Sequence, residues 1–221
     1  GVQTCALPIY KTAGVFQNWD QVNNTSAKYA GAQPGDLIFV DTNGDGSITE
    51  NDRTQIGNPH PDFTLGLNLN FSYKGFDLNL FFEGMFGNDV NSDWKKESDI
   101  WLFTNPAWKN HATRMLGGWS PDNPNSDIPA ISNNTANQEQ RFSSWFIEDG
   151  SYIKLRNIEL GYTFNFEGLK KAGISNLRLY TNGTNLITID GVKDADPEQR
   201  DASLGGYPLR KIINFGVQAT F

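Results

Sequence analysis

The residues best suited to chemistry lie in one short acidic run, residues 41–52, which reads Asp-Thr-Asn-Gly-Asp-Gly-Ser-Ile-Thr-Glu-Asn-Asp. Oxygen-bearing residues alternate along its first half, a glycine stands where a sharp turn is needed, and a carboxylate closes it. This spacing is typical of a loop that binds Ca²⁺. The candidate calcium ligands are Asp41, Asn43, Asp45, Ser47 through its carbonyl, and Asp52.

Two interpretations of this run are open. Its closing residue is Asp52, whereas such loops usually close with a glutamate that binds through both oxygens, and a shorter carboxylate reaches less far. Asn and Asp also form Asx turns, which hold a loop by its own hydrogen bonds without a metal. Calcium is therefore the candidate cofactor, and a self-supporting loop is the alternative.

Tryptophan is the second residue type with a possible binding role. Six tryptophans lie outside the strands predicted below. Their large flat surfaces could stack on sugar rings or contact a partner protein. Small cores within the loops are the alternative use for them. The candidates for substrate binding are Trp101, Trp108, Trp119 and Trp145.

Catalytic motifs do not appear in the sequence. His60 and His111 are its two histidines, and it has neither a Gly-x-Ser-x-Gly elbow nor a phosphate-binding glycine loop before a helix. Its single cysteine excludes an internal disulfide framework and a zinc cluster of cysteines. The net charge of −7 argues against nucleic acid, because basic surfaces bind phosphates. We predict no enzymatic activity.

The elements that must position these residues are long stretches in which apolar and polar side chains alternate. Over 63–73, Phe, Leu and Tyr occupy one parity and Thr, Gly, Asn and Ser the other. The same pattern recurs over 76–86, 152–166 and 213–221, and less regularly over 177–187. These runs match the ~9–11 residues of a tilted transmembrane strand, whereas soluble strands average about 5–6. Lys74-Gly75 predicts a tight hairpin turn between the first two strands.

The connections indicate which kind of sheet these strands form. The polar parity suits a water-filled lumen and the apolar parity suits lipid, although soluble sandwiches also have one apolar face. Short joints at 73–76 and 167–176 alternate with long ones at 88–150 and 188–210, as in outer-membrane barrels. About five strands cannot close a barrel, which needs about eight. The predicted fold class is all-β, an antiparallel transmembrane β-barrel segment with long extracellular loops.

Three segments are distinguished along the chain. Residues 1–9, which include Cys5, look like the in-frame translation of a sequencing-library adaptor and are left out of fold reasoning. Residues 10–61 are predicted as an extracellular loop region with one brief strand at 37–40 and an EF-hand-like loop. Residues 62–221 are predicted as C-terminal barrel strands and loops. Their end resembles the assembly signal of outer-membrane proteins, carried by Phe215, Val217, Ala219 and Phe221.

Longer motifs spread over most of the chain give a more specific indication. They occupy 35–46, 51–53, 56–63, 71–78, 81–84, 149–162, 177–180 and 183–186. Among them, Gly35-Asp36 opens the first, Asn51-Asp52-Arg53 is the second, and Asp149-Gly-Ser-Tyr begins the longest. In this order they resemble the SusC/RagA family of TonB-linked outer-membrane proteins, so the chain is identified as the C-terminal part of such a TonB-dependent receptor.

The resemblance implies a 22-stranded barrel in the outer membrane of a Gram-negative, Bacteroidetes-like bacterium. It implies import of oligosaccharides or peptides with a SusD-like surface lipoprotein as lid. The TonB complex would act through an N-terminal part that is missing here. Membrane lipid and the outer-membrane assembly machinery are further expected partners. The family's own Asn-Asp-Arg ending accounts for Asp52 and weakens the comparison with EF hands.

The alternative function is that of a secreted calcium-dependent β-sandwich that binds carbohydrate. In a sandwich the apolar parity would be buried against a second layer of the same molecule, whereas in a barrel wall it faces hydrocarbon. The side chains that decide between the two are Phe63, Leu67, Leu80, Leu160 and Phe215.

Overall fold

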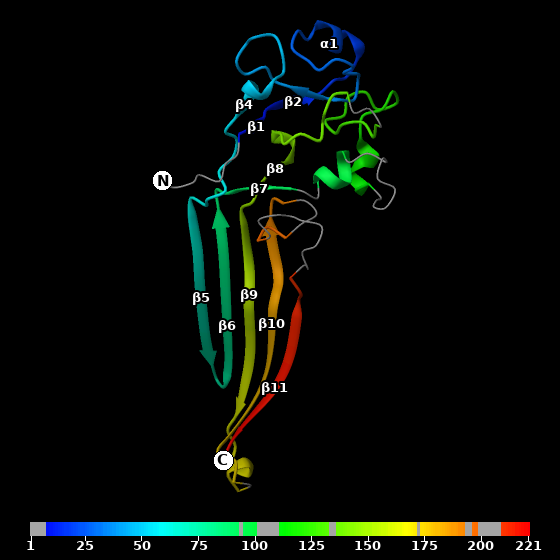
Figure 1. Cartoon of the computed structure of the whole chain (residues 1–221). Coiled ribbons are helices and arrows are strands. Elements are labelled where there is room, and N and C mark those ends of the chain that lie inside the picture. The colour runs from blue at the N-terminus through cyan, green and yellow to red at the C-terminus, as the bar shows by residue number, and fades with distance from the viewer. Residues whose placement is uncertain are drawn as a thin grey trace. The chain divides into compact units, whose positions relative to one another are not determined.

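The computed structural model describes residues 8–92, 95–100, 111–132, 136–171, 173–192, 196–198 and 209–221. Strands dominate these residues, which confirms the all-β prediction (Figure 1). The α-helices are short, α1 (Trp19–Asn24) and α3 (Glu167–Lys171). Within the described ranges no helix has the length and apolarity needed to cross a membrane. The chain divides into two compact units.

The first unit, here called the sheet unit, comprises 60–89, 149–198 and 206–221. It is one five-stranded antiparallel sheet in the order β11-β10-β9-β6-β5 (Figure 1). All five long strands predicted from alternation are present, and the fourth extends three residues beyond its predicted end at 187. The strands are β5 (Phe63–Tyr73), β6 (Phe76–Phe86), β9 (Tyr152–Phe164), β10 (Asn176–Asp190) and β11 (Ile212–Thr220).

The turn between β5 and β6 is the one that the sequence predicts. Lys74 has φ +45° and Gly75 has φ +86°. Both central residues of a type I′ hairpin need positive φ, and glycine adopts it without steric cost. The Gly75 carbonyl accepts a hydrogen bond from Thr163 N at 2.8 Å, which joins the turn to β9.

Two register shifts interrupt the sheet. One lies between β6 and β9 beside Arg156, and the other lies between β9 and β10 at Asn185 and Leu186. Asn185 has φ +55°, a backbone conformation that asparagine tolerates better than most residues. In β9 the extra residue, Arg156, moves the apolar parity from Ile158 to Leu155, so the apolar side chains on both sides of the bulge face the same way. The second bulge explains why alternation in β10 is less regular in the sequence.

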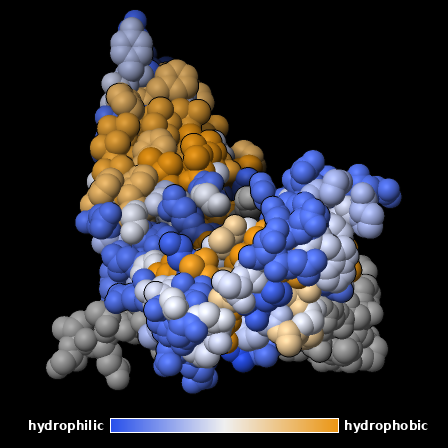
Figure 2. All heavy atoms as spheres, turned by 90° about the horizontal axis from the view of Figure 1, so that it is seen from above, coloured by the Kyte–Doolittle hydropathy of each residue, from blue (hydrophilic) through white to orange (hydrophobic). Residues whose placement is uncertain are grey.

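Register gives the sheet one apolar face. Leu69, Leu80, Ile158, Gly183 and Ile213 follow one another across all five strands. Several large side chains of this parity are exposed, among them Phe71, Leu160 and Phe215, and Figure 2 shows an orange surface on the molecule.

The exposed fractions of the five deciding side chains show whether a second layer covers the apolar face, as a sandwich would require. Phe63 is 58% exposed, Leu67 42%, Leu160 44% and Phe215 84%, and Leu80 is half-buried. The described residues of the sheet unit contain no second sheet packed on this face. The sheet unit is therefore a single layer, not a sandwich.

The second unit, here called the loop unit, comprises 1–59, 90–148 and 199–205. Its buried core includes Tyr10, Val15, Leu37, Phe39 and Phe146. The brief strand predicted at 37–40 is present as β3 (Leu37–Phe39). The unpredicted elements are β1 (Ile9–Tyr10), β2 (Thr12–Val15), β4 (Arg53–Thr54), α1 and the short turns η1 (Glu50–Asp52), η2 (Lys96–Ile100), η3 (Thr113–Gly117) and η4 (Ser144–Phe146).

The short strands of the loop unit form small pairs. β1 pairs with β4 and β2 pairs with β3. A further pair, β7 (Asp89–Asn91) and β8 (Ile147–Asp149), lies where the chain passes between the two units. Strands of two to four residues are too short to show a period, so alternation cannot reveal them.

Candidate functional site

The face of the sheet opposite the apolar one carries the polar residues and is the candidate functional surface. One register row crosses all five strands as Asn70, Asn79, Glu159, Asn182 and Asn214. Asn214 Nδ2 donates to Asn182 Oδ1 at 2.9 Å. Side-chain amides both donate and accept hydrogen bonds, so this row suits contact with water or an uncharged polar solute.

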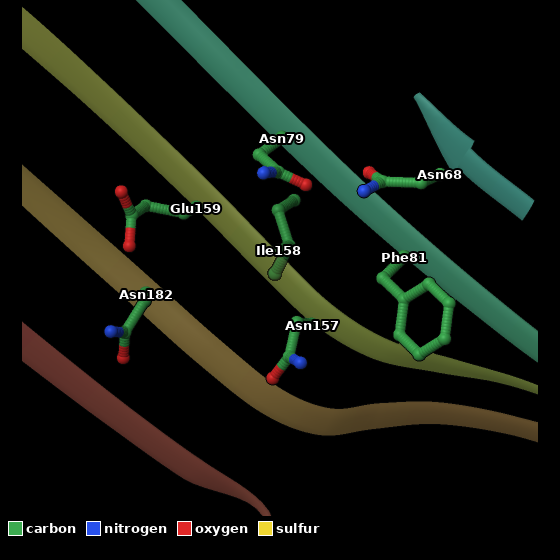
Figure 3. Close-up of a pocket in the computed structure, with 7 residues that line it drawn as sticks. All are labelled: Asn68, Asn79, Phe81, Asn157, Ile158, Glu159 and Asn182. Atoms are coloured by element: carbon green, nitrogen blue, oxygen red, sulfur yellow. The ribbon is translucent and has the colours of Figure 1, made fainter. Parts of the chain in front are cut away.

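A hollow of about 480 Å³ lies over this row. Figure 3 shows the amides of β5, β6, β9 and β10 around it, with the ring of Phe81 beside Asn157. Its lining residues are Asn68, Asn79, Phe81, Asn157, Ile158, Glu159 and Asn182.

A cluster of ion pairs ties three strands together on the polar face. Arg178 of β10 donates through Nε to Asp77 of β6 at 3.0 Å and through Nη2 to Glu159 of β9 at 2.7 Å. Its guanidinium also lies over the Tyr180 ring, 4.9 Å from the centroid. Gly161 makes the space, because a Cβ there would collide with the Arg178 guanidinium.

A second cluster joins β9 to the segment that follows β10. Lys154 Nζ lies 2.6 Å from Asp196 Oδ1 and 2.7 Å from Glu198 Oε2, and the Lys154 side chain is only 1% exposed. Arg156 pairs with Glu83 through Nε at 2.6 Å and also with Glu198. A buried cation is stable only when it is paired, so these carboxylates hold Lys154 in place.

The two clusters set the electrostatics of the polar face. Five carboxylates (Asp77, Glu83, Glu159, Asp196, Glu198) stand against three cations (Lys154, Arg156, Arg178), which gives a net charge of −2. Each carboxylate has a cationic partner and so lacks the arrangement of a general acid beside a free base. The face has the chemistry of a polar lining with a negative field.

The acidic run folds into a loop stabilised by its own hydrogen bonds. Asp52 is fully buried and its carboxylate accepts from Thr42 N at 2.9 Å and Thr49 N at 2.7 Å. The hydrogen bond from Thr49 is the main reason that the pKa of Asp52 lies below its usual value. Asp41 accepts from Gly44 N at 2.7 Å and Gly46 N at 2.8 Å.

The remaining candidate ligands belong to the same network. Asp45 N donates to Asn43 Oδ1 at 2.8 Å, and Ser47 N donates to Asp45 Oδ1 at 2.9 Å. Among the described residues no three His, Cys, Asp or Glu side chains converge in a metal-binding group. The side-chain oxygens of Asp41, Asn43 and Asp45 accept hydrogen bonds from amides of the loop itself, and Ca²⁺ binding stays a prediction.

The candidate tryptophans divide into two groups. Trp101 and Trp108 lie outside the described residues. Trp119 and Trp145 pack against the loop-unit core. Trp119 Nε1 donates to Gln17 O at 3.2 Å, and Lys95 Nζ lies 4.3 Å from the Trp145 ring centroid. Both tryptophans therefore contribute to a small core within the loops, which was the alternative to substrate binding. Substrate binding by either one stays a prediction.

Sequence reasoning passed over Trp19, which begins α1 and is 59% exposed. It lines a hollow together with Trp119. The available signal was Asn18 in front of it, a residue type that caps helices and so predicts that a helix begins at Trp19.

The last strand presents the candidate assembly signal on the apolar face. Phe215 is 84% exposed, Val217 68% and Phe221 86%, and Ala219 shares their parity. Recognition of this strand by an assembly machinery stays a prediction.

Comparison with known proteins finds TonB-dependent receptors. The chain is 37% identical over 225 residues to TonB-dependent receptor P3 of Formosa agariphila, covering 96% of this chain and 22% of the relative. It is 34% identical over 166 residues to receptor P39 of the same organism, covering 74% and 16%. It is 26% identical over 216 residues to TonB-dependent receptor SusC of Bacteroides thetaiotaomicron, covering 95% and 19%. No protein-family model matches the chain.

Solved structures agree with this fold. The structure of the RagAB peptide transporter aligns with a TM-score of 0.73 at 22% identity, over 98% of this chain and 23% of that chain. The RagAB peptide importer in an open-open state aligns with a TM-score of 0.71. The chain spans about a fifth of the length of the relatives it matches. With its two-faced sheet and its sequence motifs, it belongs to the TonB-dependent receptors of the SusC/RagA type.

Proposed function

We propose that this chain forms part of the wall and outer loops of a 22-stranded outer-membrane importer. The apolar face of the sheet contacts lipid, and the polar face lines the wet interior. The observation that supports this most directly is the exposure of the apolar face, with Phe215 at 84% and Phe63 at 58%. Leaving that much apolar surface in water is unfavourable, whereas hydrocarbon removes the cost.

The wider proposal concerns the complete receptor. It imports oligosaccharides or peptides, works with a SusD-like surface lipoprotein as lid, and draws energy from the TonB complex through parts outside this chain. The names of its relatives support this, since they include SusC and a RagAB peptide transporter. Strand edges also support a larger assembly, because open edges in lipid leave backbone groups unpaired at several kcal/mol each.

Nitroxide scanning of the complete receptor in lipid vesicles tests the orientation of the sheet. Spin labels go on Leu67→Cys and Phe215→Cys for the apolar face, with their neighbours Asn68→Cys and Asn214→Cys as matched controls of opposite parity, each in a background without other accessible cysteines. We expect labels on the apolar face to be relaxed mainly by oxygen, which concentrates in hydrocarbon. Control labels should be relaxed mainly by a water-soluble nickel chelate.

The same experiment has a clear contrary result. If the labels at 67 and 215 were as accessible to the nickel chelate as those at 68 and 214, the lipid-facing wall would be wrong. Uptake of a labelled oligosaccharide or peptide by cells with and without the proposed SusD-like lipoprotein tests the lid separately, and equal uptake by both would argue against it.

A further inference from the structure

A hollow of about 400 Å³ within the loop unit has the features of a ligand site. Trp19 and Trp119 both line it, and Ile131, which is 46% exposed, contributes to its apolar surface. Gln33, Ser120 and Ser132 supply polar groups. None of the described residues that line it has an ionisable side chain.

Trp119 is held rigidly in this hollow. Its backbone N donates to Ile128 O at 2.8 Å, and its indole Nε1 donates to Gln17 O at 3.2 Å. The ring lies against Gly35, where a Cβ would come within 2.7 Å of Trp119 Cε3. A side chain fixed in this way loses little conformational freedom when a ligand packs against it.

Trp19 is positioned by a capped helix but leaves most of its surface in water. Asn18 Oδ1 accepts from Gln21 N at 2.9 Å and so caps α1 at the residue before Trp19. Gln17 links this end of the helix to the rest of the unit through Nε2, which donates to Ser126 O at 3.0 Å. The exposed indole is thus an available face on a fixed backbone.

The polar groups of the hollow point to a ligand with hydroxyls. Gln33 Nε2 donates to Ser132 Oγ at 3.3 Å, which orients the amide beside the hollow. Ser120 Oγ accepts from Asn123 N at 3.1 Å, so its hydroxyl hydrogen can be donated elsewhere. A purely apolar ligand side chain would cover these groups without pairing them, which is costly.

We propose that this hollow binds an uncharged pyranose unit of an oligosaccharide, with the apolar face of the ring against Trp19 and its edge hydroxyls on Gln33 and Ser120. A pyranose ring combines an apolar C–H face with hydroxyls around its edge, which matches the aromatic and polar parts of the hollow. The described residues of the lining include no cation, which disfavours uronates and sulfated sugars. The inference rests on the proposed importer and selects oligosaccharides over peptides as its substrate.

Calorimetric titration of the detergent-solubilised complete receptor tests it. The probes are maltohexaose, laminarihexaose and xylohexaose, with trigalacturonate as the anionic match and trialanine as the peptide. We expect at least one neutral hexasaccharide to bind, and Trp19→Ala to weaken that binding by about tenfold or more through lost stacking. Trp19→Phe, which keeps an aromatic face, should retain most of the affinity and also guards against a folding defect.

Phe142→Ala is the matched control, because Phe142 is an aromatic residue of the same unit that is 49% exposed and does not line the hollow. It should change the affinity by less than about twofold. Three outcomes overturn the inference: no neutral hexasaccharide binds, Trp19→Ala binds as well as Phe142→Ala does, or trigalacturonate or trialanine binds equally well in a Trp19-dependent way. None of these alters the nitroxide pattern of the sheet, so failure here is distinguishable from failure of the importer proposal.

Discussion

At the residue scale, two buried carboxylates of the loop unit, Asp52 and Glu139, accept hydrogen bonds from the backbone. Asp52 receives backbone hydrogen bonds from both ends of the acidic loop, at Thr42 and Thr49. Glu139 accepts from Leu37 N at 2.5 Å and lies near the buried Asp36. Their pKa values shift in opposite directions. Hydrogen bonds stabilise the charge on Asp52 and lower its pKa, whereas burial destabilises the charge on Glu139 and raises its pKa.

Replacing Asp52 should loosen the acidic loop. In Asp52→Asn the amide group turns a donor toward a backbone N–H, so one bond becomes a donor–donor clash, at a cost of about 2 kcal/mol or more. Hydrogen exchange of the amides at 42–49 in the complete receptor measures the change. Asp45→Asn, in the exposed part of the same loop, should have a much smaller effect.

Calcium titration of the same proteins separates the two interpretations of the loop. If the loop binds Ca²⁺ as proposed, the wild type gives heat and slower exchange, and Asp45→Asn weakens both. No heat and no added protection would leave Asp52 as a structural anchor only. Because the pKa of Asp52 is lowered, its contribution to stability is present near neutral pH and is lost as the pH falls through that lowered pKa.

Glu139 should make the loop unit more stable in mild acid. Burial, with a smaller effect from Asp36, raises the pKa of Glu139 from 4.5 to about 7. The folded state therefore binds this proton more tightly than the unfolded state, and stability falls as the pH rises from about 4.5 to about 7. The fall is about 3 kcal/mol from the size of the shift.

Exchange of the Leu37 amide, corrected for its intrinsic rate, measures this dependence. Glu139→Gln should remove most of it, giving more protection than wild type at pH 8 and similar protection at pH 5. The exposed Glu50→Gln should leave the dependence intact. An unchanged pH profile in Glu139→Gln would assign the effect to another group.

Cross-strand pairing is the main feature at the element scale. Arg178 holds Asp77 and Glu159 on neighbouring strands, and Gly161 leaves room for the guanidinium. These groups are only partly buried, with side-chain exposures between 21% and 36%, so solvent screens part of the interaction.

Removing the shared cation should destabilise the sheet. Arg178→Met leaves two carboxylates facing each other and should cost about 1–3 kcal/mol after allowance for screening. Thermal unfolding of the complete receptor in detergent measures it. Adding Asp77→Asn and Glu159→Gln should recover most of the loss, whereas Lys171→Met on α3 should change little. A triple variant no more stable than Arg178→Met would mean that packing, and not charge, is lost.

The two faces of the sheet have opposite chemistry at the scale of the whole molecule. One face is an exposed apolar layer, and the other carries an amide row and a net charge of −2 from its two ion-pair clusters. The loop unit has its own core and its own hollow. The sheet unit and the loop unit thus each have their own architecture, which agrees with the proposal that the strands cross lipid while the loops meet the solute.

The sequence by itself determined the five long strands, the parity of each face and the hairpin at Lys74-Gly75. It could do so because alternation and positive-φ turns are local properties. It also identified the family through motifs in 35–46 and 149–162. The folded core of the loop unit, with strands as short as β1 and β4, leaves no periodic signal in the sequence.

Only the tertiary structure decided which side chains meet. Arg178 and Asp77 are separated by 101 residues, and Trp119 and Gln17 by 102, so no local pattern relates them. The place of Arg156 on the polar face depends on a bulge that shifts the parity of β9, and the pairing of Lys154 with Glu198 depends on where the chain returns after β10. Strand register and chain return are set by packing over the whole unit, which is why the ion-pair clusters and the tryptophan hollow appear only in three dimensions.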